Sequence, residues 1–154
     1  MRRFWKVVPC MLAATWSPIA VSAPLPPTGT FIYSDACSSP GGDFAGYRVR
    51  LMLDSKGAQA TVEFNDDGPD GHDTARNLTF NPTSGALSFS FRGGDGDQYS
   101  FHGTASLGKL MGAVDVRLAG ETNTIKGQVF TLPVIKAAPK YLPDCDPTHP
   151  AYEK

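Results

Sequence analysis

The sequence predicts an all-β fold, an antiparallel meander of about eight strands that forms a closed or partly open small barrel. Apolar and polar residues alternate along several short segments, which is the period-two pattern of strands with one buried face. The 16 glycines and 13 prolines are spread along the chain, and no stretch after residue 22 carries the apolar stripe of a helix. Such a meander must bury its apolar face and hide its edges. We favour a barrel, with a β-sandwich as the alternative.

The clearest strands form a hairpin. Val49 and Leu51 alternate with Arg48 and Arg50 in segment 47–54, and segment 58–65 returns with the same alternation after a Ser-Lys-Gly turn. The other predicted strands are 30–34, 77–80, 87–91, 99–103, 110–118 and 124–134.

The first 22 residues have the pattern of an export signal. Three basic residues precede a short apolar run, and small residues follow it. The apolar run is too short to span a bilayer, which disfavours the alternative of an uncleaved anchor. We expect cleavage after Ser22 or Ala23, a β domain over 23–136 and an extended, proline-rich tail over 137–154.

The chain without its signal is acidic. Loss of Arg2, Arg3 and Lys6 reduces the 14 basic side chains to 11, against 15 acidic ones, so the net charge is −4. This charge disfavours a nucleic-acid partner and an anionic membrane surface. We therefore expect a periplasmic or secreted monomer that binds no nucleic acid and no membrane after signal cleavage.

The cysteine count supports export. Cys10 leaves with the signal, so Cys37 and Cys145 remain. Two cysteines in an oxidising compartment most simply form one disulfide, with two free thiols or an intermolecular pair as the alternatives. Because this bond closes most of the chain into one loop, the chain-entropy model predicts a stabilisation of about 4–5 kcal/mol. The bond would also strap the tail to the loop after the first strand.

One loop contains four aspartates that are candidate calcium ligands: Asp66, Asp67, Asp70 and Asp73. Hard cations prefer oxygen ligands on a turning backbone. The spacing matches neither an EF-hand nor a glycine-aspartate nonapeptide repeat, and Asp-Gly pairs are ordinary turn residues. A solvated loop is therefore the alternative to a calcium site, and no other cofactor is predicted.

A second set of candidate residues lies on the polar faces of two predicted strands: Arg48, Arg50, Met52, Met111 and Arg117. In a closed barrel one face of each strand lines the interior, and a barrel of about eight strands either fills its lumen or holds one small ligand. We take these five as candidate ligand-binding residues, with a mixed solvent-exposed face as the alternative.

The start of the first predicted strand, Gly29-Thr30-Phe31, resembles the opening of lipocalin-like and avidin-like barrels, whose first strand carries Gly-x-Trp. Phe31 replaces the tryptophan here, and no further signature of either family is present. The resemblance covers three residues and implies no binding residue.

The sequence contains no recognisable catalytic motif. The serines lack the Gly-x-Ser-x-Gly and Ser-x-x-Lys arrangements, and the three histidines lack zinc-ligand spacing. The leading hypothesis is an exported, non-enzymatic, barrel-like binding protein for a small apolar ligand or a protein partner. The alternatives are an interaction module, such as an inhibitor or an immunity-type protein acting through its acidic loops, and a hydrolase with an unrecognised site.

Overall fold

The computed structural model describes residues 23–64, 72–127 and 129–148, in which every regular element is a β-strand. The predicted signal and three candidate calcium ligands, Asp66, Asp67 and Asp70, lie outside the described residues. The strands are β1 (Gly29–Ser34), β2 (Cys37–Ser38), β3 (Phe44–Ala45), β4 (Tyr47–Asp54), β5 (Gly57–Phe64), β6 (His72–Thr74), β7 (Arg76–Phe80), β8 (Ala86–Arg92), β9 (Gln98–Ala105), β10 (Lys109–Arg117) and β11 (Val129–Ile135).

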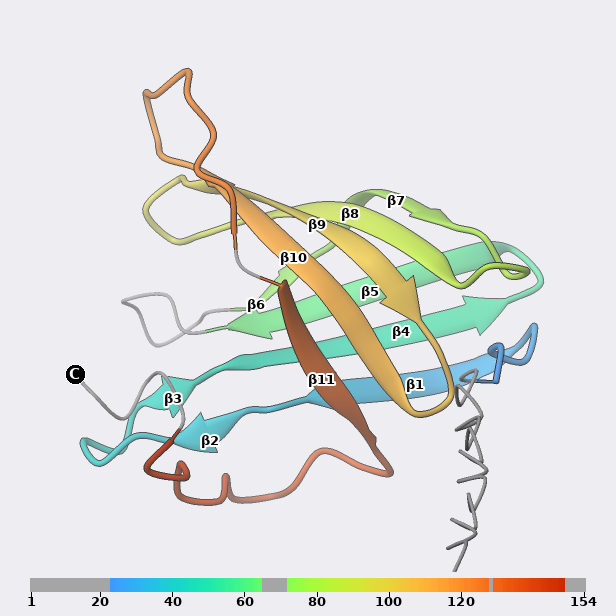
Figure 1. Ribbon diagram of the computed structural model, residues 1–154, viewed down its shortest axis with the longest axis horizontal. Helices are drawn as coiled ribbons and strands as arrows, with labels where there is room; N and C mark the ends of the chain where they lie inside the picture. Colours follow the sequence, from blue (N-terminus) through green and yellow to red (C-terminus); the bar gives the residue numbers. More distant parts are fainter. Residues whose placement is uncertain (1–22, 65–71, 128, 149–154) are drawn as a thin grey trace, which may run out of the picture.

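The main sheet is antiparallel and curls into a nearly closed barrel (Figure 1). Its strand order is β6-β5-β4-β1-β11-β10-β9-β8-β7, and β2 and β3 form a separate small sheet. The first strand therefore lies beside the last one, as closure of an up-and-down meander requires. The predicted all-β barrel is confirmed.

The barrel closes on its other side through one kinked segment. Its first part, β6, pairs with β5, and its second part, β7, pairs with β8. Between them, the amide of Ala75 donates to the carbonyl of Ala60 over 2.9 Å. The carboxylate of Asp73 accepts a hydrogen bond from the amide of Arg92 over 2.8 Å, which ties β6 to the end of β8. Backbone and side-chain bonds together therefore hold this seam.

The last strand begins later than its alternation predicts. Strand β11 starts at Val129 rather than at residue 124, and Ile125 is joined to β10 only by an isolated bridge to Val116. A β-carbon on Gly127 would collide with the carbonyl of Val114, so only glycine fits at this approach of the chain to β10. Segment 118–127 leaves the sheet and projects from the barrel (Figure 1).

One end of the barrel is closed by short turns and by the lead before β1. Ser55 and Lys56 suffice to connect β4 to β5, and 106–108 connect β9 to β10. The side chain of Leu25 is buried in the main core cluster, and the amide of Leu107 donates to the carbonyl of Ala23. Leu25 therefore acts as an apolar plug at this end.

The predicted disulfide between Cys37 and Cys145 is present, and both cysteines are buried. The tail is also held by backbone hydrogen bonds, since the amide of Ser38 donates to Pro143 and the amide of Cys145 donates to Ser38. The extended tail thus runs back past β1 to the β2–β3 hairpin (Figure 1).

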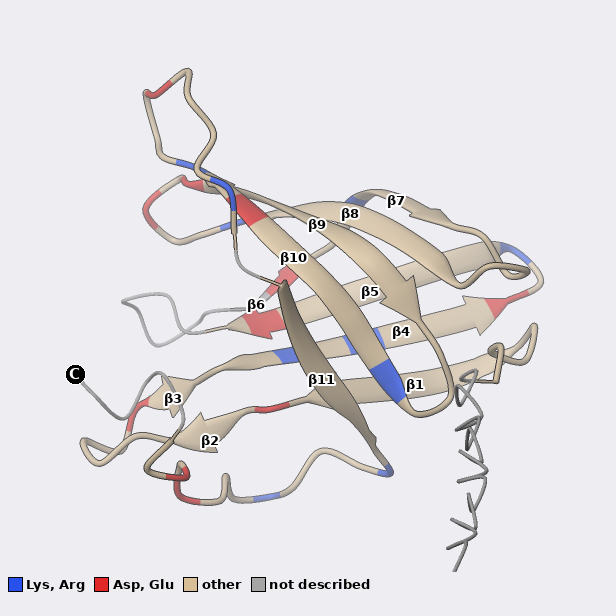
Figure 2. Ribbon diagram, viewed as in Figure 1, with Lys and Arg blue, Asp and Glu red and all other residues tan. Residues whose placement is uncertain are grey.

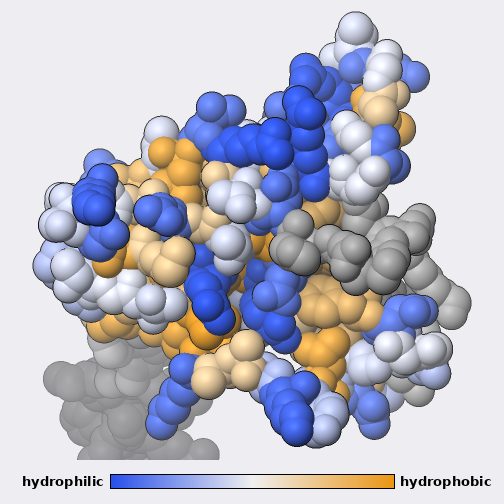
Figure 3. All heavy atoms as spheres, turned by 180° about the vertical axis from the view of Figure 1, so that it is seen from behind, coloured by the Kyte–Doolittle hydropathy of each residue, from blue (hydrophilic) through white to orange (hydrophobic). Residues whose placement is uncertain are grey.

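The charged residues lie mainly in loops and near strand ends (Figure 2). The basic residues of strand β4 are Arg48 and Arg50, and those of strand β10 are Lys109 and Arg117. Seen from behind, hydrophobic atoms are exposed between hydrophilic side chains (Figure 3). The surface is therefore mixed in character.

Candidate functional site

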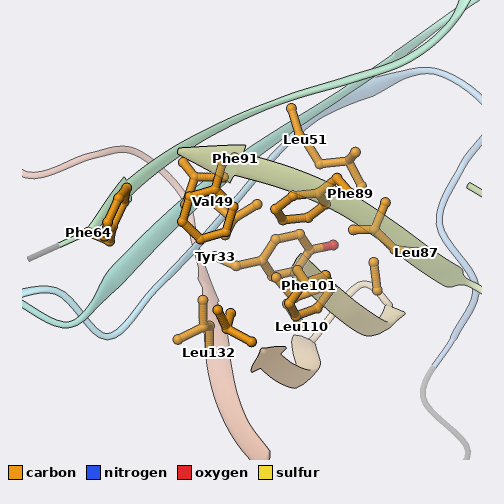
Figure 4. Packing of buried hydrophobic residues seen from close by; sticks show 14 of the residues in the cluster. Tyr33, Val49, Leu51, Phe64, Leu87, Phe89, Phe91, Phe101, Leu110 and Leu132 are labelled. Carbon is orange, nitrogen blue, oxygen red and sulfur yellow. The ribbon is translucent and has the colours of Figure 1, made fainter. Parts of the chain in front are cut away.

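The interior of the barrel is filled by its own side chains (Figure 4). Tyr33, Leu51, Phe91 and Phe101 are among the largest fully buried residues. The rings of Phe89 and Phe101 stack with their centroids 4.9 Å apart. These contacts form a continuous aromatic and aliphatic core, so the middle of the barrel has the packing of a domain interior.

The five candidate ligand-binding residues lie on the outer face of the barrel. Arg48, Arg50 and Met52 alternate along β4 with buried core residues, and Met111 and Arg117 do so along β10. Strands β1 and β11 lie between β4 and β10, so the two groups are not brought together. Their role in ligand binding remains a prediction.

Arg48 is largely enclosed, with a side chain that is 12% exposed. Its guanidinium lies 2.5 Å from a carboxylate oxygen of Glu63 on β5 and 5.8 Å from the ring centroid of Phe44. The ion pair and the cation–π contact fix the β3 segment against the outside of the barrel. These contacts give Arg48 a structural role.

Asp73 is the one candidate calcium ligand in the described part of the chain, and its carboxylate is already engaged. Besides the amide of Arg92, it accepts a hydrogen bond from the amide of Thr74 over 2.7 Å and lies 3.6 Å from the guanidinium of Arg76. Within the described ranges, no group of three or more His, Cys, Asp or Glu side chains could hold a metal ion. Calcium binding by the acidic loop remains a prediction.

The end of the barrel opposite Leu25 carries a cluster of aromatic side chains. Tyr47 begins β4, Phe64 ends β5, and Tyr99 and Phe130 lie near the starts of β9 and β11. Because neighbouring strands are antiparallel, these positions meet at one end, where Val116 of β10 joins them. We call Tyr47, Phe64, Tyr99, Val116 and Phe130 the aromatic end.

The rings of the aromatic end pack against each other. The ring centroids of Tyr47 and Phe130 are 5.2 Å apart with nearly parallel planes, and those of Phe64 and Tyr99 are 5.0 Å apart. Phe64 is buried, whereas Tyr47, Tyr99 and Phe130 are only partly buried. The core therefore ends in a layer of aromatic rings that water partly reaches.

Tyr47 is uncharged at neutral pH. Burial raises the pKa of its phenol, and the nearby carboxylate of Asp35 raises it further. That carboxylate also accepts a hydrogen bond from the amide of Tyr47 over 2.7 Å, which fixes the start of β4. The aromatic end thus presents apolar surface and the neutral phenol of Tyr47.

The connection from β10 to β11, which contains the projecting segment, lies at the aromatic end and is longer than the connections at the opposite end. Residues 93–97, which join β8 to β9 at the aromatic end, form a loop as long as residues 81–85 at the opposite end. The mouth of a β-barrel is a common position for a small-molecule site. The alternation in the sequence did not distinguish these rings from the other apolar residues. What distinguishes them from the other core residues is that they lie at or near the ends of their strands, next to loops.

Comparison of the chain with family models, with curated proteins and with solved structures found no match. The described residues include no helix that is long and apolar enough to cross a membrane. The candidate site therefore rests on the geometry of this chain alone.

Proposed function

We propose that the chain is an exported, non-enzymatic binding protein that takes up a small apolar ligand at the aromatic end. The observation that carries this proposal is the layer of partly buried rings of Tyr47, Tyr99 and Phe130 beside the long connection from β10 to β11. Partly exposed aromatic rings bury a large area at little cost in side-chain entropy when a ligand covers them.

The packed core limits the size of the ligand. Phe91 and Phe101, which lie below the aromatic end, are 1% and 2% exposed. A ligand would therefore lie on the outer layer of rings and not deep in the barrel. A planar, apolar molecule suits such a layer because it can stack on ring faces.

The proposed periplasmic or secreted location is supported by the disulfide. The buried Cys37–Cys145 disulfide is typical of proteins that mature in an oxidising compartment.

The test is a fluorescence titration of the exported, disulfide-bonded chain with the neutral probe N-phenyl-1-naphthylamine. Both tryptophans, Trp5 and Trp16, lie in the predicted signal, so the mature chain adds no tryptophan emission. We expect Phe130→Ala and Tyr99→Ala to weaken binding by about tenfold, as loss of a central aromatic contact does.

The matched control is Tyr141→Ala, because Tyr141 lies in the tail and is 77% exposed. This variant should bind the probe as the wild type does. Circular dichroism and thermal unfolding of each variant separate loss of binding from loss of fold. Absence of binding by the wild type, or unchanged binding by both aromatic-end variants, would overturn the proposal.

A further inference from the structure

The projecting segment 118–127 extends the apolar surface of the aromatic end. Ile125 and Val116 exchange two backbone hydrogen bonds of 2.7 and 2.9 Å. Residues paired in this way share one side of a sheet, and Val116 packs against the core. Leu118 directly follows the end of β10 and is two residues after Val116. Ile125 and Leu118, which are 56% and 45% exposed, thus continue the inner face of β10 beyond the barrel.

Both ends of this segment are fixed by buried carboxylates. Asp97, in the neighbouring loop, accepts a hydrogen bond from the amide of Ala119 over 2.7 Å. Asp115 accepts one from the amide of Gly127 over 3.2 Å and pairs with Lys126 over 2.5 Å. Hydrogen bonds therefore fix the position of the segment near both of its ends.

The same contacts engage the two buried carboxylates that lie next to the apolar strip, which is formed by Val116, Leu118 and Ile125. Asp97 and Asp115 are each 7% exposed, and their oxygens are directed at the amides and the lysine of the segment itself. The hydrogen bond from Lys126 and the amide of Gly127 lower the pKa of Asp115, so it stays ionised and paired. The apolar strip of Val116, Leu118 and Ile125 is itself uncharged, and the same segment also carries the exposed Glu121. An uncharged ligand complements such a surface better than an ion does.

We infer that segment 118–127 is one wall of the ligand site and that Leu118 and Ile125 contact an uncharged, apolar ligand seated on the aromatic end. This inference rests on the proposed function and adds to it the specificity-determining side chains and the charge of the ligand.

The experiment compares the double variant Leu118→Ser/Ile125→Ser with Val129→Ser. Val129 is the matched control because it is 74% exposed and pairs with Ala113, on the outer face of β10. The double variant should bind N-phenyl-1-naphthylamine about tenfold more weakly, while Val129→Ser should stay within about twofold of the wild type. The wild type should bind the anionic probe 1-anilinonaphthalene-8-sulfonate more weakly than the neutral probe.

The outcomes separate this inference from the proposed function. If Phe130→Ala loses binding and the double variant does not, the wall is refuted and the aromatic-end site stands. If the double variant and Val129→Ser lose binding equally, or if the anionic probe binds more tightly, the inference fails. A dimer in native mass spectrometry that the double variant abolishes would assign the strip to a second copy and overturn the inference. No binding of the neutral probe by the wild type overturns both proposals.

Discussion

The difference in stability between the wild type and the Tyr33→Phe variant should reverse its sign as the pH rises. Tyr33 is fully buried, and its hydroxyl donates a 2.9 Å hydrogen bond to the carbonyl of Ser106 in the β9–β10 turn. Loss of one such bond costs about 1 kcal/mol, so the wild type should be more stable than Tyr33→Phe by about that amount at pH 9.

At higher pH a second effect opposes the first. Burial raises the pKa of Tyr33 from 10.0 to about 12. The phenol therefore remains protonated in the folded chain at pH values where the unfolded chain has ionised it. This contribution to stability is complete below pH 10 and decreases as the pH rises toward 12. With these two pKa values, linkage predicts a loss of about 1.8 kcal/mol between pH 9 and about pH 11.5.

Phenylalanine does not titrate, so the two stability curves should cross near about pH 10.7, above which Tyr33→Phe is the more stable form. The assay is urea unfolding followed by circular dichroism at several pH values, with the free energy of unfolding extrapolated for each. The control is Tyr141→Phe, whose side chain is exposed and whose stability should follow the wild type throughout. A constant difference between wild type and Tyr33→Phe from pH 9 to about pH 11.5 would refute this reasoning.

Two further predictions concern the framework. Gly112→Ala should lower the free energy of unfolding by about 2–3 kcal/mol. The added β-carbon would lie 2.7 Å from ring carbons of Phe101 and even closer to the carbonyl of His102. An unchanged thermal midpoint would contradict this prediction. The double variant Cys37→Ser/Cys145→Ser should lower the free energy of unfolding by up to about 4–5 kcal/mol, because the disulfide links positions 108 residues apart. The measurement is urea unfolding. A loss under about 1 kcal/mol would show that the crosslink does not restrain the unfolded chain.

The alternation of side chains determined much of the fold. Strand β4 runs from Tyr47 to Asp54 as its pattern predicts, and its partner β5 follows after a short turn. The period-two pattern is a local consequence of burying one face of a strand, so it is visible without knowledge of any partner strand. The Cys37–Cys145 disulfide was predicted from the cysteine count, because removal of the expected signal would leave only these two cysteines.

The short elements were not predictable from their own residues. Strands β2 and β3 contain two residues each, and the seam strand β6 contains three. Their conformation depends on distant partners, such as Glu63 and Arg48 beside β3 or Arg92 beside Asp73. Local preferences in such short segments are weaker than these tertiary contacts.

The sequence by itself therefore determined which residues alternate, that the chain is all-β, and which two cysteines are joined. Only the tertiary structure decided which strand ends meet. It turned Arg50 and Met111 outward, filled the interior with aromatic side chains, and gathered Tyr47, Tyr99 and Phe130 from three strands at one end. The physical reason is that alternation specifies two faces of each strand, whereas the inner face and the shared end are defined only when the sheet closes.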